Sequence, residues 1–266
     1  MVNLGSSAGF AVLAGAAITD AGGFSTVTGN VGIYPTPGIP TGLSSGQVRN
    51  GSIFTSATSA TLLSNAQADL TIAYNDAAGR IPNINFGAVD NPLGGLTLYP
   101  GVYQFGHAAT ANLSGTLTLD AHGVSNPVWI FQATSDFITA AGAPGSPASR
   151  VVLMNGAQAG EVFWEVGSSA TIGTYSELAG TIMADQSITL TTGAQLDGAA
   201  LARIAAVTLD HNIITYPSAV PEPASAAAAG LSLVVVSLAH RAVANRRRLH
   251  ECCAVPGKSL PSEKKV

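Results

Sequence analysis

Short strand-like segments recur in the second half of this chain at the interval expected for the coils of a solenoid. Apolar and polar residues alternate within each segment, as Ile188 and Leu190 do with Thr189, which commits one face of the strand to a core. One series occupies residues 170–172, 187–190 and 206–209, a second occupies 180–183 and 198–201, and both recur at roughly 16 to 19 residues. Since each coil of such a repeat buries its apolar face only by stacking on its neighbours, we expect a mainly β solenoid.

The strand positions that face away from the expected core carry Thr, Ser, Ala and Gly in place of charged residues. Only 10% of the 266 residues are charged and 47% are hydrophobic, which argues against disorder and fits an exported β-rich protein. Small uncharged side chains on flat strands predict a surface that meets ordered water or another flat partner, and they do not predict a catalytic pocket.

The distribution of charge excludes a nucleic-acid partner. Up to Ala219 the chain has twelve acidic residues, four arginines and no lysine, which gives this body a formal charge of about −8. A protein that binds nucleic acid needs a basic stripe to replace phosphate counterions. The cysteines, Cys252 and Cys253, lie beyond the body, so we expect neither a disulfide framework nor a thiolate metal site in it.

The titratable residues of the body do not form a catalytic or metal-binding pattern. Asp69 and Asp76 are seven residues apart on an expected helix, where a solubilising or capping role is more common than catalysis. The aspartates at 185, 197 and 210 are explained by turn chemistry. The histidines at 107, 122 and 211 lack metal-ligand spacing, and phosphate-loop and nucleophile-elbow motifs are absent. We therefore expect a protein that is not an enzyme and has no cofactor or metal.

One segment departs from the β pattern. Between residues 58 and 78 apolar side chains recur at three-to-four spacing, at Leu62, Leu63, Ala66, Leu70, Ala73, Tyr74 and Ala77. This spacing describes one stripe of an amphipathic helix that ends at Gly79. We expect the helix to cover one face of the solenoid, within a single domain at residues 1–216.

The remainder of the chain has the organisation of a sorting tail. A Pro-rich linker at 217–223 precedes an apolar segment at 224–240 and a basic tail at 241–266. The order of Val220, Pro221, Glu222 and Pro223, the apolar run, and then Arg246, Arg247 and Arg248 resembles the PEP-CTERM signal of bacterial exported proteins. The resemblance implies recognition by an exosortase-type sorting machinery. The length of the apolar run predicts a transmembrane segment, and the arginines after it predict a cytoplasmic basic tail. A core helix is the alternative interpretation of the apolar run.

Export also requires an N-terminal signal, and the first residues do not resemble one. The segment from Phe10 to Ile18 is apolar but lacks a basic region before it. We expect that the given start is incomplete or that Met1 replaces an upstream leader. The predicted location is the cell surface or the extracellular space, with transient anchoring through the C-terminal segment.

Several sequence blocks resemble the microbial ice-binding (antifreeze) protein family. They occupy residues 5–15, 29–32, 68–80, 94–103, 115–121, 128–132, 155–159 and 162–173. They occur in the family's order and span nearly all of residues 3–215. The resemblance implies a right-handed discontinuous β-helix of triangular cross-section with one long α-helix alongside. It also implies ice, or ordered water, as the partner of one flat β-face.

The resemblance further implies an ice-binding motif of Thr, Ala or Gly, any residue, and Thr or Asn. The matching places read Thr174-Tyr175-Ser176-Glu177 and Thr192-Gly193-Ala194-Gln195. Because Glu177 and Gln195 depart from the motif, we expect modest activity or activity shifted to other rows. The candidate face residues are Thr174, Ser176, Thr192, Ala194, Thr19, Ser56, Thr139 and Thr215.

Three functions stay open at this stage. The leading one is adsorption to ice, which slows ice growth or recrystallisation. The second is a surface adhesion or matrix protein that uses the same face, which Glu177, Gln195 and the sorting tail favour. The third is a carbohydrate-active β-helix enzyme, which only fold analogy supports.

Overall fold

The computed structural model describes residues 1–87, 93–105 and 110–216. The expected linker at 217–223, the apolar segment at 224–240 and the basic tail at 241–266 lie outside the described residues. Within the described ranges, none of the helices has the length and apolar character needed to span a membrane.

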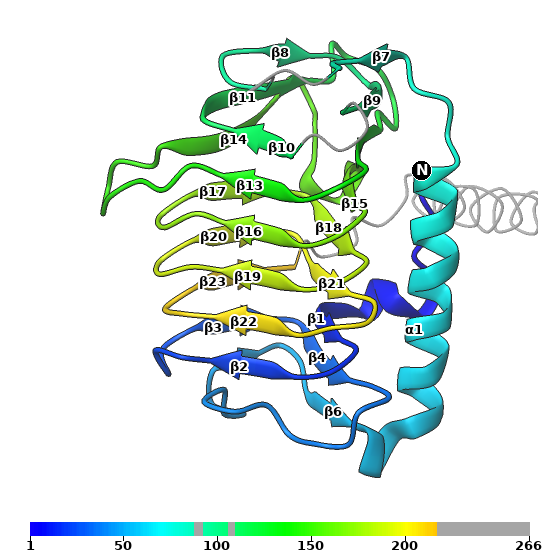
Figure 1. The fold of residues 1–266 in the computed structure, drawn as a ribbon, viewed down its shortest axis with the longest axis vertical. Coiled ribbons are helices and arrows are strands. Elements are labelled where there is room, and N and C mark those ends of the chain that lie inside the picture. The colour runs from blue at the N-terminus through cyan, green and yellow to red at the C-terminus, as the bar shows by residue number, and fades with distance from the viewer. Residues whose placement is uncertain (88–92, 106–109, 217–266) are drawn as a thin grey trace, which may run out of the picture. The chain divides into compact units, whose positions relative to one another are not determined.

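The strands form three parallel sheets, named A, B and C here (Figure 1). Sheet A contains β6 (Ile53–Thr55), β4 (Asn30–Ile33), β1 (Phe10–Ala14), β21 (Ala200–Ala202), β18 (Thr181–Ala184), β15 (Val162–Val166), β12 (Trp129–Ala133), β9 (Gly101–Gln104) and β7 (Ile84–Asn85), in spatial order. Sheet B contains β10 (Ala111–Leu113), β13 (Phe137–Thr139), β16 (Ala170–Ile172), β19 (Ile188–Leu190), β22 (Val207–Leu209) and β2 (Ile18–Asp20). Sheet C contains β5 (Val48–Arg49), β3 (Thr26–Thr28), β23 (Ile213–Thr215), β20 (Gln195–Asp197), β17 (Glu177–Ala179), β14 (Ser149–Met154), β11 (Gly115–Asp120) and β8 (Thr97–Leu98).

The chain visits the three sheets in turn, so each circuit adds one coil. β15, β16 and β17 lie in sheets A, B and C, and β18, β19 and β20 form the next coil in the same order. Thr171 is the register partner of Thr189, and Ile182 is the partner of Ala200. The two repeat series seen in the sequence are therefore stacked strands of sheets B and A.

The coils are not stacked in sequence order. β1 pairs with β21 on one side and with β4 on the other, so the first coils of the chain extend the stack below its last coil (Figure 1). The helix α1 then runs back along the stack, and the chain resumes at the far end, where β7 pairs with β9. The described residues also form two short 3-10 helices, η1 (Gly5–Gly9) and η2 (Ala159–Glu161).

The helix expected at 58–78 is α1 (Ser56–Ala78), followed by Gly79. Its apolar stripe packs on the outer face of sheet A, where Leu63 and Leu70 share a buried cluster with Phe163 and Leu201. Leu62 is the exception in the predicted stripe, because its side chain is 42% exposed. Sheet A is thus buried on both faces, and its strands read as nearly continuous apolar runs for that reason.

Polar contacts fix the position of the helix on sheet A. Gln132 donates to the carbonyl oxygens of Ala77 and Arg80, both at 2.7 Å, at the end of α1. Glu165 is buried beside Tyr74 of α1, and this burial raises the pKa of Glu165 to about 7, although the Tyr74 hydroxyl opposes the shift. The helix is therefore attached by both apolar packing and buried polar groups.

The interior of the coils is filled by side chains from all three sheets. Trp129 and Trp164 are both core residues, as expected from the sequence. Phe131 stacks on Trp164 at 4.2 Å between ring centroids, and Phe137 stacks on the same ring at 4.7 Å. Because α1 covers sheet A, sheets B and C carry the outer strand faces that solvent can reach.

Candidate functional site

The outer face of sheet B carries a single line of threonines. Each three-residue strand of this sheet buries its first and third side chains and directs the second outward. The outward residues of β16, β19, β22 and β2 are Thr171, Thr189, Thr208 and Thr19, and each is the register partner of the next. We call these four residues the threonine row. Neighbouring parallel strands lie about 4.8 Å apart, so the row repeats its hydroxyl and methyl groups at that interval.

The two ends of the row differ. Beyond Thr19, the exposed Thr41 forms an isolated parallel bridge with Thr19. At the other end, Ile138 is the partner of Thr171 and is 39% exposed, and Asn112 follows it. An isoleucine at this place replaces a hydroxyl by a larger apolar side chain, so the regular row stops at β16.

Small hydroxyl residues flank the threonine row and are hydrogen-bonded to each other. Ser169 and Ser187, which precede β16 and β19, have their hydroxyl oxygens 3.0 Å apart. On the other side, the Thr191 hydroxyl donates to the Ile172 carbonyl at 2.8 Å and lies 3.3 Å from the Thr174 hydroxyl. These contacts restrict the side chains to fixed rotamers, so the outer face of sheet B presents an ordered pattern of groups to solvent.

Charged side chains near sheet B have polar partners and do not lie in the threonine row. Asp20, the last residue of β2, is buried and accepts hydrogen bonds from Ser25 and Gln47. Asp185, which precedes β19, forms an ion pair at 2.5 Å with Arg203, which precedes β22.

After β22, Asp210 accepts a hydrogen bond from the Thr192 hydroxyl and lies 2.7 Å from His211 Nδ1. These two contacts, the Thr192 bond first, hold the pKa of Asp210 below its usual range. No member of the threonine row is charged.

Sheet C presents a different outer face from the same coils. Glu177, Gln195 and Ile213 are successive register partners there, and Arg150 pairs with Glu177 at 2.7 Å. This row of sheet C therefore holds a carboxylate, an amide and an apolar side chain in succession, and no chemical group repeats along it. Sheet C offers no regular row to a crystalline surface.

The residues proposed from the family motif are distributed over several surfaces. Thr19 belongs to the threonine row, whereas Thr174 and Thr192 lie in the turns between sheets B and C. Thr215 is exposed on sheet C, in register with Asp197. Ser56 is the first residue of α1 and does not lie on a β-face.

Three of the proposed residues are buried, which corrects their assignment to an exposed face. Ser176 is 1% exposed, Ala194 is 0% and Thr139 is 3%. Tyr175 and Gly193 adopt positive φ angles of 53° and 70°, and this left-handed turn directs the following side chain inward. Ser176 accepts a hydrogen bond from Thr139 at 2.9 Å inside the stack.

The departures from the motif also fall on another surface. Glu177 and Gln195 belong to sheet C, so neither interrupts the threonine row. The expectation of modest activity stays a prediction, and the carboxylate on which it depends lies on sheet C and not on sheet B. Thr171, Thr189 and Thr208 were not proposed, although their alternation with buried apolar neighbours was visible in the sequence.

The described part of the chain lacks any group of three or more His, Cys, Asp or Glu side chains placed to hold a metal ion. Asp69 receives the backbone N–H of Ser6 at 2.7 Å and Asp76 pairs with Arg80 at 2.8 Å. Both carboxylates of the helix therefore have structural partners.

Sequence comparisons connect the chain with proteins of one kind. The family described as "Ice-binding-like" matches residues 12–215. An ice-binding protein of Nostoc sp. (strain HG1) is 43% identical over 248 residues, which cover 90% of this chain and 86% of that protein. An ice-binding protein of a Colwellia species is 37% identical over 226 residues, covering 82% of this chain and 84% of the relative.

Solved structures agree with the sequence comparisons. An ice-binding protein from an Antarctic biological consortium superimposes with a TM-score of 0.70 at 36% identity, covering 82% of this chain and 91% of that one. The ice-binding protein of the Antarctic ascomycete Antarctomyces psychrotrophicus gives a TM-score of 0.71 at 32% identity, covering 82% and 99%. Both the sequence and the fold of the described body are thus similar to those of proteins named for binding ice.

Proposed function

The chain belongs to the ice-binding protein family, and from this premise we propose that it adsorbs to ice through the outer face of sheet B. The observation that carries the assignment is the threonine row, in which Thr171, Thr189, Thr208 and Thr19 are consecutive register partners. Adsorption at this face slows the growth or recrystallisation of ice.

The chemistry of the row explains why it suits a frozen surface. The methyl group of threonine excludes disordered water, and its hydroxyl group holds one water molecule in a defined place. Because the strands repeat at about 4.8 Å, the row holds surface water at regular intervals before any contact with ice. The protein pays little entropy on adsorption, since Ser169, Ser187 and Thr191 are already hydrogen-bonded.

We further infer that the protein acts by adsorption alone and carries out no reaction. The titratable groups beside sheet B have structural partners, as in the Arg203–Asp185 ion pair and the Thr192–Asp210 hydrogen bond. The relatives are named for binding ice and not for a reaction.

We also propose that the body is a right-handed discontinuous β-helix of triangular cross-section, because the chain visits three parallel sheets in turn. The general preference of parallel connections for the right hand supports the proposed handedness. In this arrangement α1 covers one side of the prism, and sheets B and C form the other two sides.

Sorting and location stay proposals that rest on the sequence. Val220, Pro221, Glu222 and Pro223, followed by an apolar run and Arg246–Arg248, resemble the PEP-CTERM signal. We propose export to the cell surface or the surroundings, with the tail recognised by an exosortase-type machinery and held transiently in the membrane.

Two of the three observations that favoured adhesion do not apply to sheet B, and the third, the sorting tail, lies outside the described residues. Glu177 and Gln195 supported that alternative, but both lie on sheet C. The outer face of sheet B has no charged group in its central row for specific adhesion to a polar partner.

Thermal hysteresis and recrystallisation inhibition by residues 1–216 test the proposed function. We expect activity in the unmodified body and its loss in Thr189→Tyr, because a large ring at the centre of the row separates the remaining threonines from ice. Gln195→Tyr, in the same coil but on sheet C, is the matched control and should keep full activity. An inactive body, or equal activity in the two variants, would rule out this assignment.

A further inference from the structure

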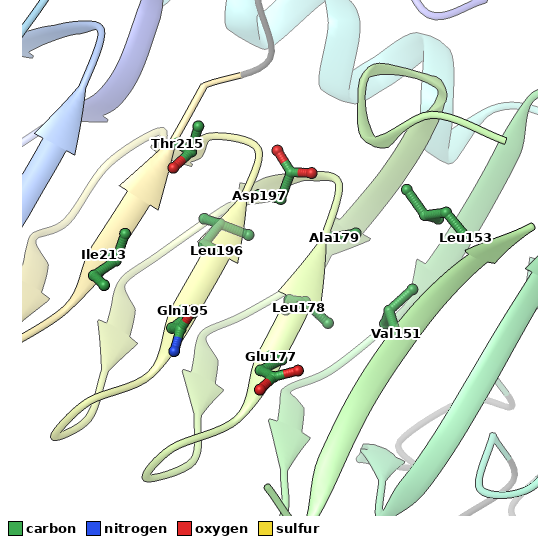
Figure 2. A pocket seen from close by; sticks show the side chains of 10 residues that line it. All are labelled: Val151, Leu153, Glu177, Leu178, Ala179, Gln195, Leu196, Asp197, Ile213 and Thr215. Atoms are coloured by element: carbon green, nitrogen blue, oxygen red, sulfur yellow. The ribbon is translucent and has the colours of Figure 1, made fainter. Parts of the chain in front are cut away.

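Sheet C is split along part of its length. β14 pairs with β11 through all six residues, from Ser149 to Met154. On its other side β14 pairs with β17 only at Arg150–Glu177. The two strands then diverge, as Figure 2 shows. The second half of β14 is therefore an open strand edge inside an otherwise continuous sheet.

The backbone groups at this edge can be assigned from the pairing of β14. In a parallel sheet, alternate residues direct both their N–H and C=O groups to the same neighbouring strand. The carbonyls of Ala148 and Met154 accept hydrogen bonds from Gly115 and Ala121 on the β11 side. Val151 and Leu153 consequently face β17, where the ladder ends after Glu177. The C=O of Val151 and both backbone groups of Leu153 are left without a strand partner.

A cavity of about 420 Å³ lies at this split, within the range of small ligand sites. Val151 and Leu153 contribute an apolar wall, and Ala179, Gln195, Asp197 and Thr215 contribute from the neighbouring strands (Figure 2). Apolar side chains beside a free strand edge are the combination used where an extended segment adds to a sheet.

The cavity also has a charge preference. Its lining contains two carboxylates and no basic residue. Glu177 is neutralised by Arg150 at 2.7 Å, whereas the Asp197 side chain forms no hydrogen bond or ion pair within the part of the chain that the structure describes. A ligand with a positive charge therefore complements Asp197.

We propose that the split in sheet C binds an extended peptide that carries a basic side chain. The peptide backbone pairs with Val151 and Leu153 of β14, and its Lys or Arg side chain pairs with Asp197. The site lies on a different sheet from the threonine row, so it is a second binding function, and its occupant is a segment of another protein at the cell surface. Alternating main-chain groups select a peptide over a saccharide.

Fluorescence anisotropy with the full chain tests the proposal directly. The probe is a labelled heptapeptide of sequence Ser-Lys-Val-Lys-Val-Lys-Ser in low salt. Asp197→Lys should weaken its binding by about tenfold or more, because like charges are then juxtaposed. Thr28→Lys is the matched control, since Thr28 follows Asp197 and Thr215 in the same row of sheet C but does not line the cavity. It adds the same charge and should have little effect.

A second probe separates strand pairing from simple attraction of charge. The same peptide, N-methylated at every residue, keeps its charge but cannot donate backbone hydrogen bonds, and it should not bind. Equal binding of both peptides, or equal effects of Asp197→Lys and Thr28→Lys, would overturn the proposal. Displacement of the peptide by a neutral oligosaccharide would also overturn it and assign the cavity to a sugar.

The ice activity of the same variants keeps this test independent of the proposed function. Asp197→Lys leaves the threonine row intact and should retain full thermal hysteresis. Thr189→Tyr should bind the peptide like the unmodified protein. A loss of peptide binding in Thr189→Tyr would show that the two sites are not separate and would contradict the proposal.

Discussion

Sheets B and C are built by the same coils, yet the side chains on their outer faces differ in size, charge and regularity. Sheet B repeats one small side chain in Thr171, Thr189, Thr208 and Thr19. Sheet C places Glu177, Gln195 and Ile213 at equivalent positions of successive coils. Stacking requires only that the inward residues be apolar, so the outward residues are free to serve different functions. The regularity of sheet B is therefore not needed for the fold, which is why we propose a function for it.

Exchanging the chemistry of the two faces should produce the largest effect. Thr189→Glu places on sheet B the kind of side chain that Glu177 provides on sheet C. Because an ice-bound carboxylate loses hydration, we expect thermal hysteresis to fall to about a tenth or less. Gln195→Glu adds the same charge to sheet C of the same coil and should leave the activity unchanged. A similar loss in both variants would show that net charge matters and that the face does not.

Separating the methyl from the hydroxyl of threonine sharpens the comparison further. Replacing Thr171, Thr189 and Thr208 together by valine keeps the shape and removes the hydroxyls, whereas replacement by serine removes the methyls. We expect each triple variant to lose roughly half of the hysteresis or more, since both groups order water at the row. Full activity in the valine variant would show that the hydroxyls are not needed for ice binding. Full activity in the serine variant would show the same of the methyls.

Glu165, which is buried on sheet A beside Tyr74 of α1, predicts an effect of pH on stability that involves neither sheet B nor sheet C. Burial raises the pKa of Glu165 from 4.5 to about 7, so the folded state favours the protonated form. The resulting stability is complete below pH 4.5 and is lost as the pH rises through 7, an effect on the order of 3 kcal/mol.

Glu165→Gln should abolish this part of the pH dependence. The amide keeps an acceptor for Tyr74 but carries no charge, so the variant should be more stable than the parent at pH 8 and about equal to it at pH 4.5. Thermal unfolding at pH 4.5, 6 and 8 measures the difference, and Glu177→Gln on sheet C is the matched control. A constant difference at all three pH values would contradict the assignment to Glu165.

Extending the threonine row should give the smallest effect. Ile138→Thr adds one threonine to the four-residue row, in register with Thr171, and we expect hysteresis to rise by roughly a quarter, in proportion to the length of the row. Ile213→Thr makes the same change on sheet C and should have no effect. A decrease in Ile138→Thr would mean that the isoleucine itself contacts ice.

The repeat and the helix could be predicted from the sequence because each has a strong periodic signal. The stacking of Thr171 on Thr189 follows from the repeat, and the stripe from Leu63 to Ala77 follows from helical spacing. The position of the first coils below β21 could not be predicted, because no local pattern records which coil stacks on a distant one.

The candidate face was predicted only in part, and the reason lies in the turns. The motif that begins at Thr192 crosses from sheet B to sheet C through the left-handed residue Gly193, so Ala194 turns inward and Gln195 belongs to the next face. A linear motif does not show such a change of face. The alternation around Thr189 does show it, since Ile188 and Leu190 are buried on either side.

A bulky polymer attached to one face at a time tests the central claim most directly. With Cys252 and Cys253 replaced by serine, the chain has no other cysteine, so Thr189→Cys and Gln195→Cys each offer one site for a polyethylene glycol maleimide. We predict that modification at position 189 abolishes thermal hysteresis and that modification at position 195 leaves it intact. The reverse result, or loss at both positions, would contradict the assignment of ice binding to sheet B.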